Sequence, residues 1–264
     1  MAFERIKLEF QDDVAVLTLS HPEALNAVSL KMLAELTEAI DMASDRTHGA
    51  RCLLMTGEGR AFCAGANLTD DAVDRSDGER DAGKVLEERY HPFLLKLRNL
   101  KMPFITAVNG VAAGVGMSFA LMGDLVLVAR SAYFLQAFKR IGLVPDGGST
   151  FLLPRLVGMR RAMELSMLAE RLPAEKALEW GLISRVHDDA ELMGEAMTLA
   201  KELAAGPTVA LSLIRKAYWE SPENTYEQQL HVERMLQREA GLTKDSIEGV
   251  HAFVEKRPAN FTGE

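Results

Sequence analysis

Residues 109–116 read Asn-Gly-Val-Ala-Ala-Gly-Val-Gly and follow an apolar run, 103–108, that predicts a buried strand. A helix running to about Met122 is expected directly after them. Small side chains in such a turn let a ligand approach the main chain closely. The first N–H groups of a helix have no intrahelical partner, and the helix dipole favours negative charge there. The stretch therefore predicts a strand–turn–helix unit whose backbone is suited to holding an anion.

Two other segments share this character. Residues 61–68 read Ala-Phe-Cys-Ala-Gly-Ala-Asn-Leu and come just after another predicted strand, and residues 142–150 read Gly-Leu-Val-Pro-Asp-Gly-Gly-Ser-Thr. Two backbone N–H groups that converge on one oxygen would form an oxyanion hole. For any one segment alone, tight strand-to-helix packing is the better explanation, since it also demands glycine and alanine.

The rest of the chain predicts an α/β core followed by helices. Alternating apolar residues at 6–10 and a buried run at 14–19 indicate a hairpin, and a helix is expected over 29–44. The charged segment 70–88 is expected to be a mobile loop or lid. Further strands are expected at 51–55, 125–128 and 132–135. Further helices are expected near 85–100, 151–157, 160–168, 174–179, 190–205, 209–219, 226–239 and 244–255.

Composition excludes several classes of partner and cofactor. The formal net charge of −8, with no long basic run, argues against nucleic acid as a general partner. Cys52 and Cys63 are too few for a disulfide framework and suit a reducing compartment. The N-terminus lacks the apolar stretch of a signal peptide, and no segment has the apolar length of a membrane span, so a cytoplasmic protein with no membrane partner is expected. No histidine or cysteine cluster has zinc spacing, and no metal is expected.

In their order and spacing, the three glycine-rich segments resemble the crotonase superfamily, also called the enoyl-CoA hydratase/isomerase family. The resemblance extends from the first hairpin through Leu25-Asn26-Ala27 to the ending Phe-Val-Glu-Lys-Arg-Pro at 253–258. It implies a spiral of strand–strand–helix units over residues 1–200. A C-terminal helical region over residues 201–264 would mediate trimerisation, and two trimers commonly stack into a hexamer.

The resemblance also implies which residues handle a coenzyme A thioester, which would be the substrate, with no permanently bound cofactor. The two oxyanion N–H groups fall on Ala66 and Val115. A valine departs from the usual glycine at that position, but the donor belongs to the main chain, so the chemistry survives if the backbone angles suit valine. The implied coenzyme A contacts are Leu25, Ala27, Phe62, Ala64, Ala66, Asn67, Leu68, Phe253 and Lys256.

The last two of these contacts would come from a neighbouring subunit, and each has a simpler explanation. Lys256 is equally well explained as a solvated helix end. For Phe253, packing in the core is somewhat favoured.

The reaction depends on which carboxylates are present. The two glutamates that hydratases of this family use to activate water fall on Ser118 and Phe138, so both are missing. Asp146 is the remaining acid. Partial burial would raise its pKa and favour proton transfer, whereas nearby helix amides would oppose that shift. Asp146 is equally suited to capping the following helix.

The chain is therefore predicted to be an acyl-CoA isomerase that moves a proton or double bond through a thioester enolate, with Asp146 as acid and base. The segments at 111–114, 129–132 and 142–146 are similar to the branch containing the ring-epoxide isomerase of phenylacetyl-CoA degradation. Alternatives are an enoyl-CoA hydratase that uses Asp146 and a water, an acyl-CoA hydrolase or dehalogenase, and a non-catalytic acyl-CoA binding protein. The sequence leaves open the acyl group and the choice between trimer and hexamer.

Overall fold

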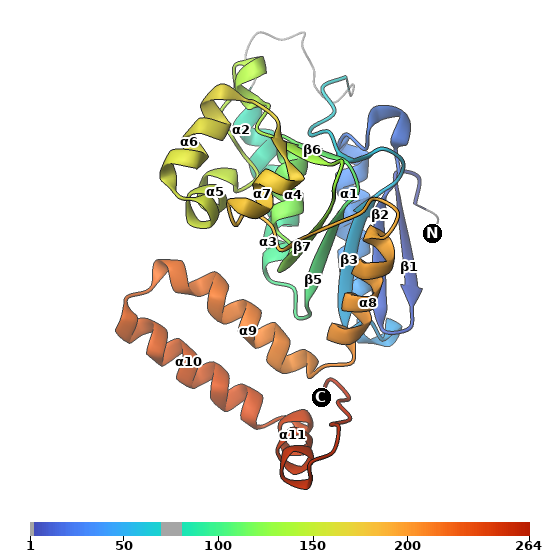
Figure 1. Cartoon of the computed structure of the whole chain (residues 1–264), viewed down its shortest axis with the longest axis vertical. Coiled ribbons are helices and arrows are strands. Elements are labelled where there is room, and N and C mark those ends of the chain that lie inside the picture. The colour runs from blue at the N-terminus through green and yellow to red at the C-terminus, as the bar shows by residue number, and fades with distance from the viewer. Residues whose placement is uncertain (1–2, 70–80) are drawn as a thin grey trace.

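A computed structural model describes residues 3–69 and 81–264 and contains two β-sheets (Figure 1). The larger sheet has the strand order β1-β2-β3-β5-β7-β10. β1 and β2 form the predicted hairpin and pair antiparallel, and the remaining pairs are parallel. Its strands are β1 (Ile6–Gln11), β2 (Val14–Leu19), β3 (Cys52–Gly57), β5 (Phe104–Val108), β7 (Leu125–Ala129) and β10 (Arg185–His187).

The smaller sheet has the order β4-β6-β8-β9, and its strands are β4 (Ala61–Cys63), β6 (Val111–Ala113), β8 (Tyr133–Leu135) and β9 (Leu172–Pro173). The first three each follow directly after a strand of the larger sheet, namely β3, β5 and β7. The chain thus repeats a strand–strand–helix unit, which confirms the predicted spiral. β4 and β6 were expected to be turns, because three residues are too few to display a strand's period-two pattern.

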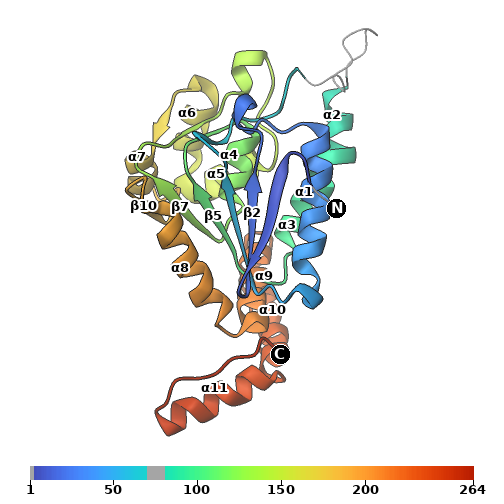
Figure 2. The same ribbon diagram turned by 90° about the vertical axis from the view of Figure 1, so that its right-hand side faces the viewer.

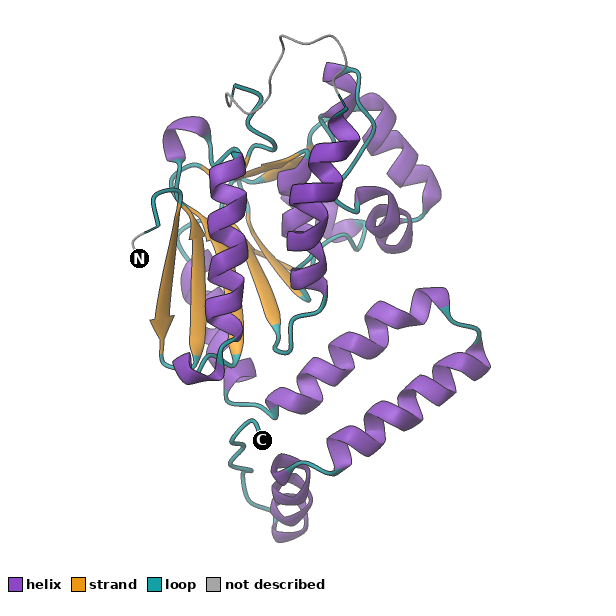
Figure 3. Ribbon diagram, turned by 180° about the vertical axis from the view of Figure 1, so that it is seen from behind, coloured by secondary structure: helices purple, strands orange, loops and turns teal. Residues whose placement is uncertain are grey.

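Helices cover both faces of the larger sheet. α1 (Leu30–Ser44) lies on one face, and α8 (Leu192–Ala204) contacts β3 and β5 on the other (Figures 1 and 3). The Ser29 hydroxyl accepts a hydrogen bond from the Met32 N–H and caps α1. The apolar face of α1 is buried, which matches the helical spacing of Leu33, Leu36 and Ile40.

The segment before α3 (His91–Arg98) differs from expectation. Residues 70–80 of the expected loop lie outside the described part of the chain. α2 (Ala82–Val85) and a π-helix (Leu86–Tyr90) then run without a break into α3. The helix expected from about residue 85 is confirmed, and the loop expectation is wrong for residues 82–84, which are already helical. The Asp81 carboxylate starts this run by accepting hydrogen bonds from two backbone N–H groups, and the buried Tyr90 side chain anchors its end.

The remaining helices form two groups. Near the smaller sheet lie α4 (Val115–Leu121), α5 (Ser149–Val157), α6 (Met159–Leu168) and α7 (Ala174–Glu179). At the opposite end of the molecule lie α9 (Thr208–Glu220), α10 (Tyr226–Gly241) and α11 (Lys244–Glu255) (Figure 2). The 3-10 turns are Pro22–Ala24, Arg46–His48, Phe138–Ile141 and Ser221–Glu223.

An ion pair between a buried arginine and a partly exposed aspartate attaches the C-terminal helices to the core. The Arg215 guanidinium of α9 lies 2.7 Å from the Asp124 carboxylate and also donates to the carbonyl oxygens of Leu97 and Arg98. The division proposed at residue 200 falls within α8 and stays a prediction. None of the helices in the described ranges has the length and apolar character of a membrane span.

Candidate active site

The glycine-rich segments meet at the carboxyl ends of the parallel strands, where ligands bind in open α/β sheets. The first follows β3 and the second follows β5. A Cβ atom built on Gly65 would lie 3.1 Å from the carbonyl oxygen of Ala113 and 3.8 Å from the Cα of Gly114. The two main chains are therefore in direct contact, and the next residue of each segment is a predicted oxyanion donor, Ala66 or Val115.

The amides that flank these two donors are already engaged. The N–H of Asn67 donates to the carbonyl of Val28 at 2.9 Å, and the N–H of Gly114 donates to the carbonyl of Leu135 at 2.9 Å. In the described part of the chain, the N–H groups of Ala66 and Val115 donate no hydrogen bond to the protein. Both are thus available to a ligand.

Valine at position 115 is compatible with this geometry. Gly114 adopts φ 51° and ψ −128° immediately before α4, a conformation that side-chain-bearing residues avoid. Val115 is already the first helical residue of α4. The unusual backbone angles therefore fall on the glycine, and the valine takes ordinary helical ones.

The predicted coenzyme A contacts at 25–28 and 62–68 lie side by side. The Ala64 N–H donates to the Leu25 carbonyl at 3.0 Å, and the Val28 N–H donates to the Gly65 carbonyl at 2.8 Å. These bonds bring Leu25 and Ala27 beside Ala64, Ala66 and Asn67. Of the other two residues in this set, Phe62 is fully buried in β4 and Leu68 is 39% exposed.

Asn26 holds the first of these segments in place, a role that sequence reasoning did not assign to it. Leu25 and Asn26 both have left-handed backbone angles, with φ of 53° and 56°. The buried Asn26 amide accepts a hydrogen bond from the His21 N–H at 2.8 Å and donates to the Ala61 carbonyl at 2.8 Å. An asparagine tolerates the left-handed region better than most residues, so both its conformation and its side chain suit this turn.

The last two predicted contacts lie far from the other seven within one chain. α11 sits at the opposite end of the molecule from β6 (Figure 1). Phe253 is 85% exposed, so the core-packing explanation is wrong for this residue. Lys256 is exposed and ends α11 with a left-handed φ of 56°. Contact with coenzyme A from a neighbouring subunit stays a prediction.

Asp146 lies at the turn before α5 without capping that helix. The N-cap residue is Gly148, with no side-chain hydrogen bond, so the capping explanation of Asp146 is wrong. The Asp146 Oδ1 atom is buried and has no hydrogen-bond partner among the described residues. Burial raises the pKa of this carboxyl from 3.8 to about 6, and the charge of His91 opposes the shift. A carboxyl with these properties can carry a proton near neutral pH.

Asp146, Gly147 and Gly148 form the turn before α5, called the Asp146 turn below, and this turn packs against the first turn of α4. A Cβ atom built on Gly147 would lie 3.0 Å from Val115 Cγ2 and 2.9 Å from Ser118 Cβ. The Phe138 ring lies on another side, 3.8 Å from the Cβ position of Gly114. The structure thus places the Asp146 turn beside the oxyanion segment, and neither Ser118 nor Phe138 supplies a carboxylate.

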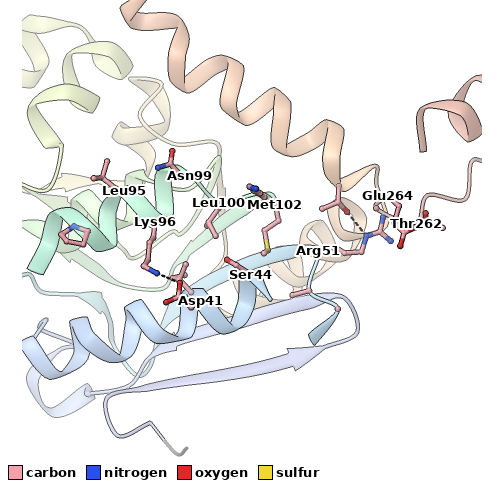
Figure 4. A pocket seen from close by; sticks show the side chains of 17 residues that line it. Asp41, Ser44, Arg51, Leu95, Lys96, Asn99, Leu100, Met102, Thr262 and Glu264 are labelled. Carbon is pink, nitrogen blue, oxygen red and sulfur yellow. Dashed lines mark hydrogen bonds and ion pairs between the residues drawn. The ribbon is translucent and has the colours of Figure 1, made fainter. Parts of the chain in front are cut away.

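A separate cavity of about 740 Å³ lies at the opposite, amino ends of β3 and β5 (Figure 4). Two of its cationic side chains are already engaged. Lys96 forms an ion pair with Asp41, and Arg51 donates to the Thr208 hydroxyl at 2.8 Å. It includes none of the glycine-rich segments, so we do not place the active site there. In residues 3–69 and 81–264, no cluster of three or more potential metal ligands occurs.

Comparison with known proteins agrees with this geometry. Residues 9–264 match the family model described as enoyl-CoA hydratase/isomerase. The chain belongs to this family. It is 46% identical to the 1,2-epoxyphenylacetyl-CoA isomerase of Escherichia coli over 99% of both chains. It is 43% identical to a probable enoyl-CoA hydratase of Rhodobacter capsulatus over the full length of both.

Solved structures of the enoyl-CoA hydratase/isomerase family share the fold. An enoyl-CoA hydratase from a Polaromonas species has a TM-score of 0.89 at 34% identity, covering 97% of this chain and 99% of that chain. The family relationship makes the chain an enzyme that acts on coenzyme A thioesters. Within the family, the isomerase interpretation is favoured over the hydratase, hydrolase and binding-protein alternatives.

The raised pKa of Asp146 predicts a pH-dependent effect of Asp146→Asn on stability. Ionising this carboxyl costs more in the folded state than in the unfolded state, so the wild type loses stability relative to the variant as pH rises from about 4 to about 6. After allowance for partial solvent screening, we expect a relative change of about 1–2 kcal/mol between pH 4 and pH 7. Urea unfolding across this range measures it. A difference between the proteins that stays constant with pH would contradict the assignment.

Proposed function

We propose that this enzyme isomerises an acyl-CoA by removing a proton from the carbon next to the thioester and returning it elsewhere on the same acyl group. The N–H groups of Ala66 and Val115 hold the enolate oxygen, and Asp146 carries the proton. One observation carries the proposal: two backbone N–H groups without partners among the described residues flank the contact between Gly65 and Gly114, with the Asp146 turn packed beside them.

Double-bond migration illustrates the proton balance. The Asp146 carboxylate takes a proton from the α-carbon of a β,γ-enoyl-CoA, and the electrons of that C–H bond move to the thioester oxygen. The carboxylic acid then protonates the γ-carbon as the electrons return, which leaves an α,β-enoyl-CoA and a carboxylate. Because the pKa of Asp146 is about 6, the group is mostly ionised at pH 7 and still strong enough as an acid to return the proton.

The substrate class follows from the family and its relatives. The segments at 25–28 and 62–68 would bind coenzyme A, largely through backbone groups, and no resident cofactor is proposed. The named relative in Escherichia coli supports a ring-epoxide of phenylacetyl-CoA as one substrate. A β,γ-enoyl-CoA is the other, since both reactions need a stabilised thioester enolate and one mobile proton.

Replacing the proposed acid and base tests the chemistry directly. Asp146→Asn should lower turnover by at least about 100-fold, because general acid–base catalysis contributes about 10²–10⁴ in rate. Deuterium exchange at the α-carbon, followed by mass spectrometry on a panel of acyl-CoAs, measures the loss. Coenzyme A thioester binding should persist, which calorimetry checks. Undiminished exchange in the variant would refute the role of Asp146.

A hydratase is the second candidate, because the Rhodobacter capsulatus relative carries that name. Incubation with crotonyl-CoA distinguishes the two reactions, since a hydratase forms 3-hydroxybutyryl-CoA. Release of free coenzyme A or a trapped aspartyl adduct would instead indicate a hydrolase or dehalogenase. Acyl-CoA binding without any α-proton exchange would indicate a non-catalytic binding protein.

The oxyanion donors belong to the main chain, so their orientation is tested through Gly114. Gly114→Ala forces a side chain into φ 51° and should misdirect the Val115 N–H, which lowers kcat by about 10²-fold or more. Gly158→Ala is the matched control, because Gly158 also has a positive φ, 81°, but has no atom within 4 Å of its Cβ position. We expect the control to lose stability while keeping its kcat. Equal loss of kcat in both variants would argue against the hole.

We also propose a cytoplasmic homotrimer or homohexamer. Apolar side chains are exposed along α11, where Ile247, Val250, Phe253 and Val254 are all at least 56% exposed. Such a face marks an interaction surface. Light scattering should give three or six times the 29.1 kDa chain mass, and Phe253→Asp should shift the population towards smaller species. A stable wild-type monomer would reject the assembly.

A further inference from the structure

A buried chain of polar side chains lies beneath the Asp146 turn. The Gln136 Nε2 atom lies 3.3 Å from Ser149 Oγ, Ser149 Oγ lies 2.8 Å from Ser118 Oγ, and Ser118 Oγ lies 3.1 Å from the carbonyl oxygen of Asp146. All three side chains are fully buried. Gln136 follows β8, Ser149 begins α5 and Ser118 lies in α4. These hydrogen bonds therefore join three separate parts of the fold.

The donors and acceptors fix the direction of these hydrogen bonds. A carbonyl oxygen only accepts, so the single hydroxyl proton of Ser118 goes to Asp146. Ser149 must then donate its own proton to Ser118, and its oxygen remains free to accept from the Gln136 amide. Each hydroxyl therefore donates once and accepts once. The two hydroxyls are satisfied, although the buried Oε1 atom of Gln136 has no hydrogen-bond partner among the described residues. Hydrogen bonds of this kind restrict the movement of the two serine side chains.

This chain of bonds ends on the backbone of the residue that needs precise placement. The Asp146 carbonyl accepts from both the Ser118 hydroxyl and the Ser149 N–H, the latter at 3.0 Å. The next two residues, Gly147 and Gly148, adopt left-handed angles, with φ of 61° and 85°. Since the Asp146 Oδ1 atom has no partner in the described structure, this turn is positioned through its main chain.

We propose that Ser118, with Ser149 and Gln136 behind it, positions the Asp146 carboxyl for proton transfer in the isomerisation. The inference rests on the proposed function. Without the Ser118 hydroxyl, the Asp146 carbonyl loses one of its two donors and the turn gains freedom over α4. The carboxyl then samples positions from which it cannot reach the substrate carbon, whereas the coenzyme A contacts at 25–28 and 62–68 stay unchanged.

A double-mutant cycle between Ser118→Ala and Asp146→Asn tests this dependence. In the wild-type background, Ser118→Ala should lower kcat by about 10- to 100-fold, since small misplacements of a reacting group cost about that much. KM should change by less than about threefold. In the Asp146→Asn background, Ser118→Ala should cause no further loss of α-proton exchange. An equal loss in both backgrounds would show a general structural effect and overturn the proposal.

Thr106→Val is the matched control. The Thr106 hydroxyl is also fully buried and also donates to a backbone carbonyl associated with α4, that of Ala120 at 2.7 Å, but it does not contact the Asp146 turn. Its removal should lower stability and leave kcat within about twofold of wild type. A loss of kcat as large as that of Ser118→Ala would contradict a specific role for Ser118.

Failure of this inference differs from failure of the proposed function. Full turnover by Asp146→Asn alone would overturn the proposed function and this inference together. Loss of turnover in Asp146→Asn, with unchanged kcat in Ser118→Ala, would overturn only the positioning role. If Ser118→Ala does not fold, Gln136→Met takes its place in the double-mutant cycle, because it removes the amide that donates to Ser149. We expect Gln136→Met to lower kcat severalfold. An unchanged kcat would overturn the proposal.

Discussion

The site depends on the close approach of α4 to β4. A Cβ atom on Gly116 would lie 2.3 Å from the carbonyl oxygen of Cys63, so only glycine allows the helix to rest on the strand. The Cys63 thiol is enclosed in this contact, and burial raises its pKa to about 12, so it acts as a packing group and not as a nucleophile. The approach carries the Gly65 and Gly114 backbones together, and this proximity places Ala66 and Val115 at one site.

Backbone donors explain how the site tolerates side-chain change. An N–H group keeps its direction as long as the angles around it are kept, and the left-handed or otherwise unusual angles here fall on Gly65, Gly114 and Gly147. The residue that presents the second N–H can therefore be a valine. Asp146 is under the opposite constraint, since its chemistry lies in its side chain, and its placement depends on the hydrogen bonds to its own carbonyl group.

The sequence predicted those parts of the molecule that local patterns determine. The first hairpin, α1, and the strand β5 and helix α4 within residues 103–122 all follow from periodicity and small residues. β8 was expected, but β4, β6, β9 and β10 escaped prediction, because two or three residues display little or no period and their pairing partners lie far along the chain. The sequence around Asp146 also could not decide whether this residue caps α5. Gly147 and Gly148 both adopt left-handed angles, so the N-cap position falls on Gly148, two residues after Asp146. The buried chain beneath Asp146 joins three segments that only the folded structure brings together.

The surroundings of Asp146 favour proton transfer between carbons over the addition of water. Adding water to a double bond requires groups that hold the water and activate it as well as a group that delivers the proton. The Ser118 hydroxyl is fully buried and already donates to Asp146 and accepts from Ser149, so it has little capacity left for a water molecule. Phe138 places an apolar ring beside Gly114. One carboxyl oxygen without a partner in residues 3–69 and 81–264 remains, and one carboxyl is sufficient to take a proton from one carbon and return it to another.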